Sequence, residues 1–216
     1  MERPVRMINL ASFKVISWNM QGGADDATKS TQIRKWIGDK NVHVILLQEC
    51  GALFGWGAND FAGEGWQVLR QDWTGPQNGN NRCSLAVLVR GGAKAYHVTD
   101  AVKDSHRPLI GAQHHSGFWF FSAHCPASGN AAPYRQAALE SSLVWSGGHP
   151  MLCAGDFNAA PQPFQGFQLC NTGGKTHMRG NELDYGYCHK IECSATAICL
   201  NVGASDHAAI EFTFVG

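Results

Sequence analysis

Acidic, amide and imidazole side chains stand at the ends of several apolar stretches in this 216-residue chain. They are Asn19, Glu49, His124, Asp156, Asn158, Asp184, Asp206 and His207. Carboxylate and amide oxygens are hard ligands, which suit Mg²⁺ or Mn²⁺ better than zinc. Histidines close to carboxylates suit proton transfer and the stabilisation of a charged phosphate. If the apolar stretches are strands, these side chains converge at one edge of the sheets and form one site.

Each of these residues also has a structural interpretation. A carboxylate at the end of a strand usually caps a turn, and a lone histidine on a strand is usually a hydrogen-bonded core residue. The segment GDFN (155–158) on its own is compatible with a simple turn. The functional interpretation therefore depends on the ordered set of segments and not on any one of them.

Six short segments follow one another along the chain: SWNMQG (17–22), LLQE (46–49), SAHCPASG (122–129), GDFNAAP (155–161), ELDYG (182–186) and SDHAAI (205–210). Their order resembles the endonuclease/exonuclease/phosphatase superfamily, and the resemblance extends from Phe13 to Val215. It implies an α/β fold of the DNase I-like type. In this fold, a four-layer αββα sandwich, two mixed or antiparallel sheets carry outer helices and the active site lies at the strand ends.

The resemblance also implies a site for a divalent metal ion. Glu49, assisted by Asn19, would bind the ion. Asp206 would complete the coordination shell of the metal and of its bound water. The expected cofactor is Mg²⁺, with Mn²⁺ or Ca²⁺ as alternatives.

The same resemblance assigns the catalytic residues. Asp156 and Asn158 would bind or activate the nucleophilic water and the scissile phosphate, and His207, oriented by Asp184, would contact that phosphate. His124 would flank the phosphate from the other side. The sequence does not tell which histidine acts as acid and which as base, because the spacing of coupled groups does not reveal their roles.

The histidine at position 124 distinguishes branches of the superfamily. Abasic-site endonucleases have tyrosine there, whereas the DNase I, sphingomyelinase and cytolethal-distending-toxin branches have histidine. The catalytic B subunit of the toxin branch is most similar, through FKVISWNMQG (13–22), RPLIG (107–111), GDFNAAP and ELDY. Arg107 of RPLIG resembles a toxin arginine that contacts the substrate phosphate, so we expect Arg107 to bind substrate, together with Asn19.

Two features depart from these relatives. DNase I pairs its histidine with a glutamate in the strand that corresponds to Asn81–Val89, where this chain offers Arg82 and no carboxylate. The residue that orients His124 is therefore open. The chain is also short between Tyr187 and Ser205, which puts assembly with toxin partners in doubt more than catalysis.

The sequence therefore predicts a metal-dependent phosphodiesterase, a deoxyribonuclease of the cytolethal-distending-toxin B type that nicks DNA and leaves 5′-phosphate ends. A phosphoinositide phosphatase or sphingomyelinase-like enzyme is the main alternative. Phe54-Gly-Trp56 is the only candidate for the apolar loop that a lipid enzyme needs. A catalytically silent binding module is a further alternative, which the complete set of polar residues disfavours.

The expected partner is the DNA backbone, with little sequence specificity, and toxin delivery subunits or an immunity protein are further candidates. The net charge is zero, which argues against tight binding of nucleic acid by charge alone. Four arginines are expected to gather near the strand ends: Arg82, Arg107, Arg135 and Arg179. The protein is expected to be secreted or delivered into a target cell, although residues 1–13 lack the apolar stretch of a signal peptide. No apolar run reaches the length of a transmembrane segment.

The eight cysteines have two interpretations. They are either buried thiols that act as small hydrophobic side chains or members of one to three disulfides in an extracytoplasmic protein. No CxxC spacing occurs, which disfavours a structural zinc site.

Apolar and β-branched patterning predicts many strands and few helices in a single domain of residues 13–216, preceded by an N-terminal extension of residues 1–12. Helices are expected at Thr28–Asp39 and Ala131–Trp145, with a short one after Pro161. The expected strands are Phe13–Asn19, Val42–Gln48, Trp66–Gln71, Ser84–Arg90, Leu109–His114, Gly117–His124, His149–Ala154, Asp184–His189 and Ala208–Val215.

Overall fold

The structure of the protein is a computed structural model. It describes residues 13–22, 27–51, 64–73, 83–99, 107–127, 129, 131–199 and 205–214. The extension 1–12, the apolar segment Phe54-Gly-Trp56 and Arg82 lie outside the described residues. The domain boundaries expected from the sequence stay a prediction.

Twelve described strands form two six-stranded sheets. The first has the order β11 (Cys193–Cys199), β12 (Ala209–Phe214), β1 (Lys14–Asn19), β2 (Val42–Gln48), β4 (Leu85–Arg90), β3 (Trp66–Gln71). The second has the order β5 (Ala93–Thr99), β6 (Leu109–His114), β7 (Trp119–His124), β8 (Met151–Asp156), β10 (Asp184–His189), β9 (Gln168–Cys170). Each sheet is mixed, because β1 and β2 are parallel, as are β7 and β8, while the remaining pairs are antiparallel.

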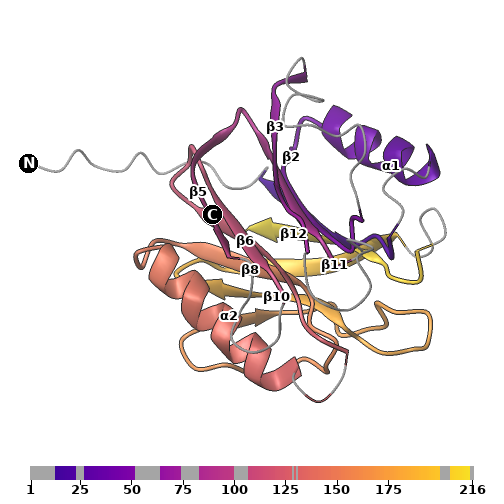
Figure 1. The fold of residues 1–216 in the computed structure, drawn as a ribbon, viewed down its shortest axis with the longest axis vertical. Coiled ribbons are helices and arrows are strands. Elements are labelled where there is room, and N and C mark those ends of the chain that lie inside the picture. The colour runs from indigo at the N-terminus through magenta and orange to yellow at the C-terminus, as the bar shows by residue number, and fades with distance from the viewer. Residues whose placement is uncertain are drawn as a thin grey trace, which may run out of the picture.

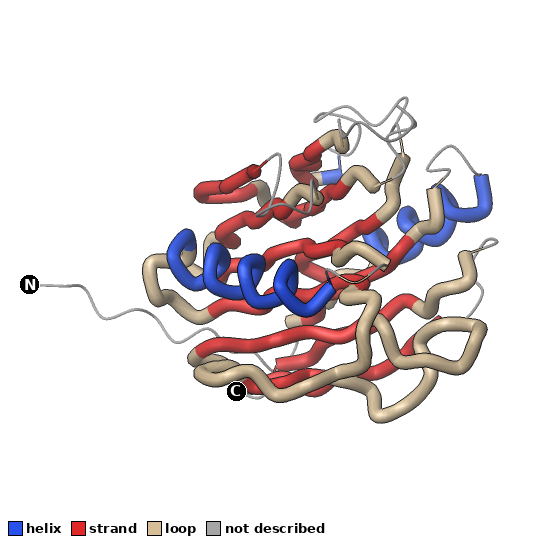
Figure 2. The backbone as a smooth tube through the Cα atoms, turned by 60° about the horizontal axis from the view of Figure 1, so that its bottom comes forward, coloured by secondary structure: helices blue, strands red, loops and turns tan. Residues whose placement is uncertain are grey.

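The two sheets pack face to face and each carries one described helix on its outer face (Figures 1 and 2). Helix α1 (Ala27–Gly38) buries Ile33, Trp36 and Ile37, which lie three and four residues apart on one side of a helix. Helix α2 (Ala131–Trp145) covers the other sheet in the same way through Tyr134, Ala138 and Leu139. The expected four-layer αββα fold is confirmed.

A separate apolar layer fills each of the three interfaces. Between the sheets, side chains such as Leu46, Ile110 and Phe212 are fully buried. Trp18 packs in the layer under α1, and Phe121 packs in the layer under α2. The central strands are buried on both faces, which is why they appear in the sequence as nearly continuous apolar runs.

Three strands were not expected from the sequence. Strand β5 lies at a sheet edge with four of its seven residues only partly buried and the other three exposed, so it lacks an apolar run. Strand β9 has only three residues, and β11 is composed mainly of small side chains. The strands that were expected agree with the structure to within about two residues at each end.

The short helix expected after Pro161 is wrong. Residues 161–164 have no regular structure and lead into a turn at 165–166. Pro161 and Pro163 cannot donate backbone hydrogen bonds, and a residue before proline avoids helical backbone angles. The segment is held instead by Tyr187, whose hydroxyl donates to the carbonyl of Gln162 at 2.7 Å.

The cysteines follow both expected interpretations. Cys170 of β9 and Cys193 of β11 form a disulfide, which links an edge strand of one sheet to an edge strand of the other. Five further cysteines in the described part of the chain are all buried: Cys50, Cys83, Cys125, Cys153 and Cys188. Burial raises the pKa of Cys50 and of Cys153 to about 12, so these thiols are poor nucleophiles at neutral pH. Among the described helices, none is long and apolar enough to cross a membrane.

Candidate active site

The buried carboxylate of Asp156, at the end of β8, is the centre of the polar cluster. Its Oδ2 accepts hydrogen bonds from Asn19 Nδ2 at 2.9 Å and from Asn158 Nδ2 at 3.1 Å, and its Oδ1 accepts from the Asn158 backbone at 2.8 Å. Asn158 has a left-handed backbone with φ of 47°, which asparagine tolerates better than most residues. Its amide also donates to the carbonyl of Cys125. These contacts fix the orientation of the Asp156 carboxylate.

Strand pairing brings the first histidine to this carboxylate. His124 is directly opposite Asp156 in the parallel pair β7–β8, and its Nε2 lies 3.6 Å from Asp156 Oδ2 and 3.5 Å from Glu49 Oε1. Its Nδ1 lies 3.0 Å from Arg107 Nη1. A guanidinium only donates, so Nδ1 accepts and the ring proton resides on Nε2. Arg107 is thus a described partner of His124 Nδ1.

The second histidine approaches from the loop before β12. His207 Nδ1 lies 2.8 Å from Asp184 Oδ2, and its Nε2 lies 3.7 Å from Asp156 Oδ2. Asp184 opens β10, where it pairs with Asp156 in register, and its backbone N–H donates to Thr176 Oγ1. The expected pairing of His207 with Asp184 is therefore present in the structure.

Burial disfavours the negatively charged forms of Asp156 and Asp184. Burial raises the pKa of Asp156 to about 7, and the nearby charge of Asp184 adds to the effect. Burial also raises the pKa of Asp184. For His207, burial alone lowers the pKa, but the hydrogen bond and charge of Asp184 outweigh it and bring the value to about 9. A cation in the site would relieve this repulsion among carboxylates.

At this cluster, two groups of three described side chains are close enough together to share a metal ion: His177, Asp206 and His207, and Asp156, Asp184 and His207. A third such group, Cys170, Cys188 and Cys193, lies elsewhere and contains the disulfide. One oxygen each of Asp206 and Asp184 is buried and has no hydrogen-bond partner among the described residues. This donor set fits a divalent cation that prefers oxygen ligands.

Glu49 belongs to neither of these two groups. The Asn19 amide already donates to Asp156, and its Oδ1 accepts from the backbone of Gln21. The assignment of Glu49, Asn19 and Asp206 as the ligands of one ion stays a prediction.

Comparison with known proteins identifies the family of this chain. Residues 16–207 match the model of the Endonuclease/Exonuclease/phosphatase family. The chain belongs to this family. It is a hydrolytic phosphoesterase of the DNase I-like type. No curated protein matches the sequence of this family member.

Several solved structures share the fold of this phosphoesterase at low sequence identity. The Haemophilus ducreyi cytolethal distending toxin has 19% identity and a TM-score of 0.71, with 95% of this chain and 99% of that chain covered. CdtB, described as the biologically active subunit of cytolethal distending toxin, has 17% identity and a TM-score of 0.73, with coverages of 95% and 98%. The human Nocturnin catalytic domain has 17% identity and a TM-score of 0.71, with 94% of each chain covered.

The polar cluster around Asp156 contains one residue that the sequence did not indicate. His177 precedes the ELDY segment in a turn, and its Nε2 lies 3.2 Å from Asp206 Oδ2. In the sequence, His177 is only a histidine in a polar stretch, five residues before Glu182. This feature is too common to identify a site residue.

Of the arginines expected at the strand ends, Arg107 lies beside His124 and Arg179 is exposed in the turn after His177. The expectation is wrong for Arg135. Its guanidinium is buried and donates to the Tyr185 hydroxyl at 2.9 Å and to the Ala160 carbonyl at 3.3 Å. An arginine so occupied does not contact substrate.

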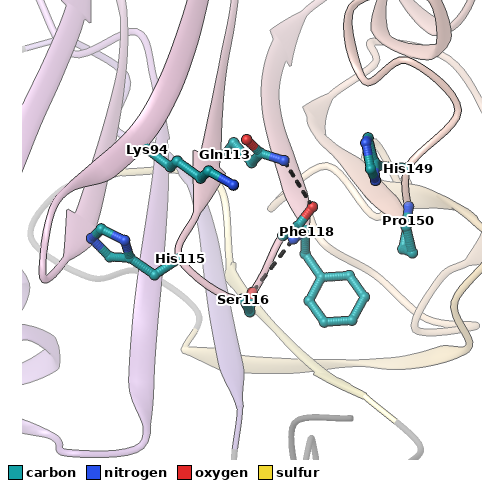
Figure 3. A pocket seen from close by; sticks show the side chains of 8 residues that line it. Lys94, Gln113, His115, Ser116, Phe118, His149 and Pro150 are labelled. Carbon is teal, nitrogen blue, oxygen red and sulfur yellow. Dashed lines mark hydrogen bonds between the residues drawn. The ribbon is translucent and has the colours of Figure 1, made fainter. Parts of the chain in front are cut away.

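A cavity of about 560 Å³ lies at the other end of the second sheet, where β7 and β8 begin (Figure 3). Lys94 and His149 lie on opposite sides of Phe118 there. The cavity is lined by Lys94, Gln113, His115, Ser116, Gly117, Phe118, His149 and Pro150. It shares no residue with the phosphoesterase site.

Proposed function

We propose that the chain is a divalent-metal-dependent endonuclease that hydrolyses phosphodiester bonds of DNA, in the manner of a cytolethal-distending-toxin B subunit. One observation carries this proposal. The Nε2 atoms of His124 and His207 lie 3.6 and 3.7 Å from the same oxygen, Asp156 Oδ2. Two imidazoles on either side of a fixed carboxylate form a site that can hold a phosphate and transfer a proton at the same time.

The two histidines have different roles because their Nδ1 partners differ. Arg107 holds Nδ1 of His124 as an acceptor, so Nε2 of His124 serves as a hydrogen-bond donor to a phosphate oxygen. Asp184 holds Nδ1 of His207, an arrangement that orients an imidazole for proton transfer through Nε2. Asp156, fixed by Asn19 and Asn158, positions the attacking water.

Glu49 and Asp206 would hold the divalent ion, with Asn19 beside them. The bound ion would neutralise phosphate charge and stabilise the leaving oxygen. The unpartnered Asp206 Oδ1 and the raised pKa of Asp156 support a cation at this edge of the sheets.

DNA is the substrate that we favour. The resemblance to cytolethal distending toxin in sequence segments and in fold supports this choice. Since the net charge is zero, binding to duplex DNA would be weak, dominated by phosphate contacts such as that of Arg107, and largely independent of sequence. The Cys170–Cys193 disulfide supports a secreted or delivered protein, because disulfides persist in oxidising compartments. Delivery subunits or an immunity protein would then be its partners.

The test is to incubate the protein with supercoiled plasmid in the presence of Mg²⁺, Mn²⁺ or excess EDTA, and in parallel with a phosphoinositide. We expect metal-dependent conversion to nicked circles, no conversion in EDTA, and little phosphate release from the lipid. Intact plasmid together with rapid phosphate release would reject the nuclease in favour of a lipid phosphatase.

A further inference from the structure

The two carboxylate oxygens of Asp206 have different surroundings. Oδ2 lies 3.2 Å from His177 Nε2. Oδ1 is buried, has no hydrogen-bond partner among the residues that the structure describes, and lies 3.7 Å from His207 Nε2. A carboxylate with one oxygen bound and the other unpartnered is poised to accept a cation or a water on its second oxygen.

His177 can only donate to Asp206. Its Nδ1 accepts a hydrogen bond from the backbone N–H of Arg179 at 3.1 Å, so the ring proton resides on Nε2, the atom that faces Asp206. The ring is 9% exposed and packs edge-on against His207, with ring centroids 4.7 Å apart. The imidazole therefore has one orientation and one protonated nitrogen.

Backbone contacts hold this turn against the loop that contains Asp206. Met178 N–H donates to the Asp206 carbonyl at 2.9 Å, and Ala208 N–H donates to the Thr176 carbonyl at 2.7 Å. These bonds need no side chain at position 177. A buried histidine in a turn is often structural, but here the backbone already joins the two segments, so the imidazole is available for another role.

We propose that His177 is a positioning residue that binds Asp206 Oδ2 and thereby presents Asp206 Oδ1 to the divalent cation of the active site. The inference rests on the proposed metal-dependent function. Without His177, the Asp206 carboxylate would rotate about its χ2 torsion and lose its fixed direction. Residues that orient a metal ligand in this way typically change metal affinity by about 10- to 100-fold when they are replaced.

The experiment measures Mn²⁺ affinity of the full chain by calorimetric titration without substrate, in four variants. His177→Phe keeps a ring without a donor, and His177→Asn shortens the donor arm. We expect both to weaken Mn²⁺ binding by about 10- to 100-fold. His177→Gln keeps an amide donor near the place of Nε2 and should retain most of the affinity. His115→Phe, at the far end of the second sheet, is the control and should bind as wild type.

Activity supplies a second readout. Nicking by His177→Phe should be slow at low Mn²⁺ and recover at saturating Mn²⁺, a rescue that a purely structural defect would not show. Wild-type Mn²⁺ affinity in folded His177→Phe and His177→Asn would overturn the inference and leave the proposed function intact. Equally weak binding by folded His177→Gln would also contradict it. A wild-type protein that neither binds Mn²⁺ nor nicks plasmid would instead overturn the proposed function, and this inference with it.

Discussion

Asp156 shows how much of the site depends on single hydrogen bonds. Three donor groups from Asn19 and Asn158 hold it, while both histidines point their Nε2 atoms at it. The carboxylate is buried, so it has few alternatives to these partners. Substitutions at the surrounding donors should therefore lower both activity and stability, because a buried carboxylate that loses a hydrogen bond is left partly unsatisfied.

The donor role of His124 makes a specific prediction. His124→Ala should reduce the nicking rate by about 10²- to 10³-fold, the usual effect of losing one donor to a charged transition state. His124→Gln should recover to within about tenfold of wild type, because its amide N–H can take the place of Nε2–H. Initial rates on supercoiled plasmid measure both. If the glutamine variant is as slow as the alanine variant, His124 transfers a proton and is not only a donor.

Among single residues, the sequence predicted the identities and the pairing of His207 with Asp184, and it left the partners of His124 and Asp206 open. The motif segments indicated Asp156, His124 and His207, which the structure brings together. Arg107 as the partner of His124 and His177 as the partner of Asp206 were not predicted in these roles, because both contacts join segments that only the tertiary fold brings together.

At the scale of elements, the parallel strand pairs β1–β2 and β7–β8 position the residues of the candidate site. Their carboxyl ends carry Asn19, Glu49, His124 and Asp156 at one edge of the sandwich. Gly155, directly before Asp156, allows β7 and β8 to approach closely. It has φ of 154°, and a Cβ there would overlap the carbonyl oxygen of Ala123.

Gly155→Ala should therefore destabilise the protein by about 1–3 kcal/mol or more, the usual cost of overpacking, and reduce activity by displacing Asp156. Gly174→Ala is the matched control, because the backbone of Gly174 is not left-handed. The atom nearest to a Cβ at position 174 would be the Thr172 hydroxyl oxygen, at 3.9 Å. Urea unfolding of both variants measures the difference. Equal midpoints for Gly155→Ala and wild type would show that β8 can shift without cost.

The sequence predicted the buried strands and both long helices, because a strand covered on both faces and a helix with one apolar side leave clear patterns. It did not predict β5, β9 or β11, since edge strands and small-residue strands have no such pattern. The Cys170–Cys193 pair lies between two of these strands, so pairing was not predictable without them.

For the whole molecule, His114 should contribute a loss of stability as the pH decreases below neutral. Burial, together with the neighbouring charges of His43 and His115, lowers the pKa of His114 to about 4. His114 also packs edge-on against Phe13, with ring centroids 5.0 Å apart. The folded protein therefore keeps this imidazole neutral at pH values where the unfolded chain protonates it.

The sign of the effect follows from this difference. An unfolded histidine binds a proton near pH 6.5, whereas folded His114 does so near pH 4, so stability falls as the pH decreases between these values. The melting temperature of His114→Asn, measured relative to that of wild type, should therefore rise as the pH decreases over this interval. Thermal melts between pH 4 and pH 7 measure it. Parallel curves for the variant and wild type would show that His114 does not contribute.

The central claim is that Asp156, His124 and His207 form a phosphodiesterase site, and His207 offers its most direct test. The measurement is the nicking rate of supercoiled plasmid in Mg²⁺ by wild type and by His207→Gln, purified in parallel and verified as folded by their melting curves. We predict that wild type nicks the plasmid and that His207→Gln is slower by about 10²- to 10⁴-fold, because the amide cannot transfer the proton. Equal nicking by the two proteins would contradict the account, since the activity would then come from another site or from a contaminant.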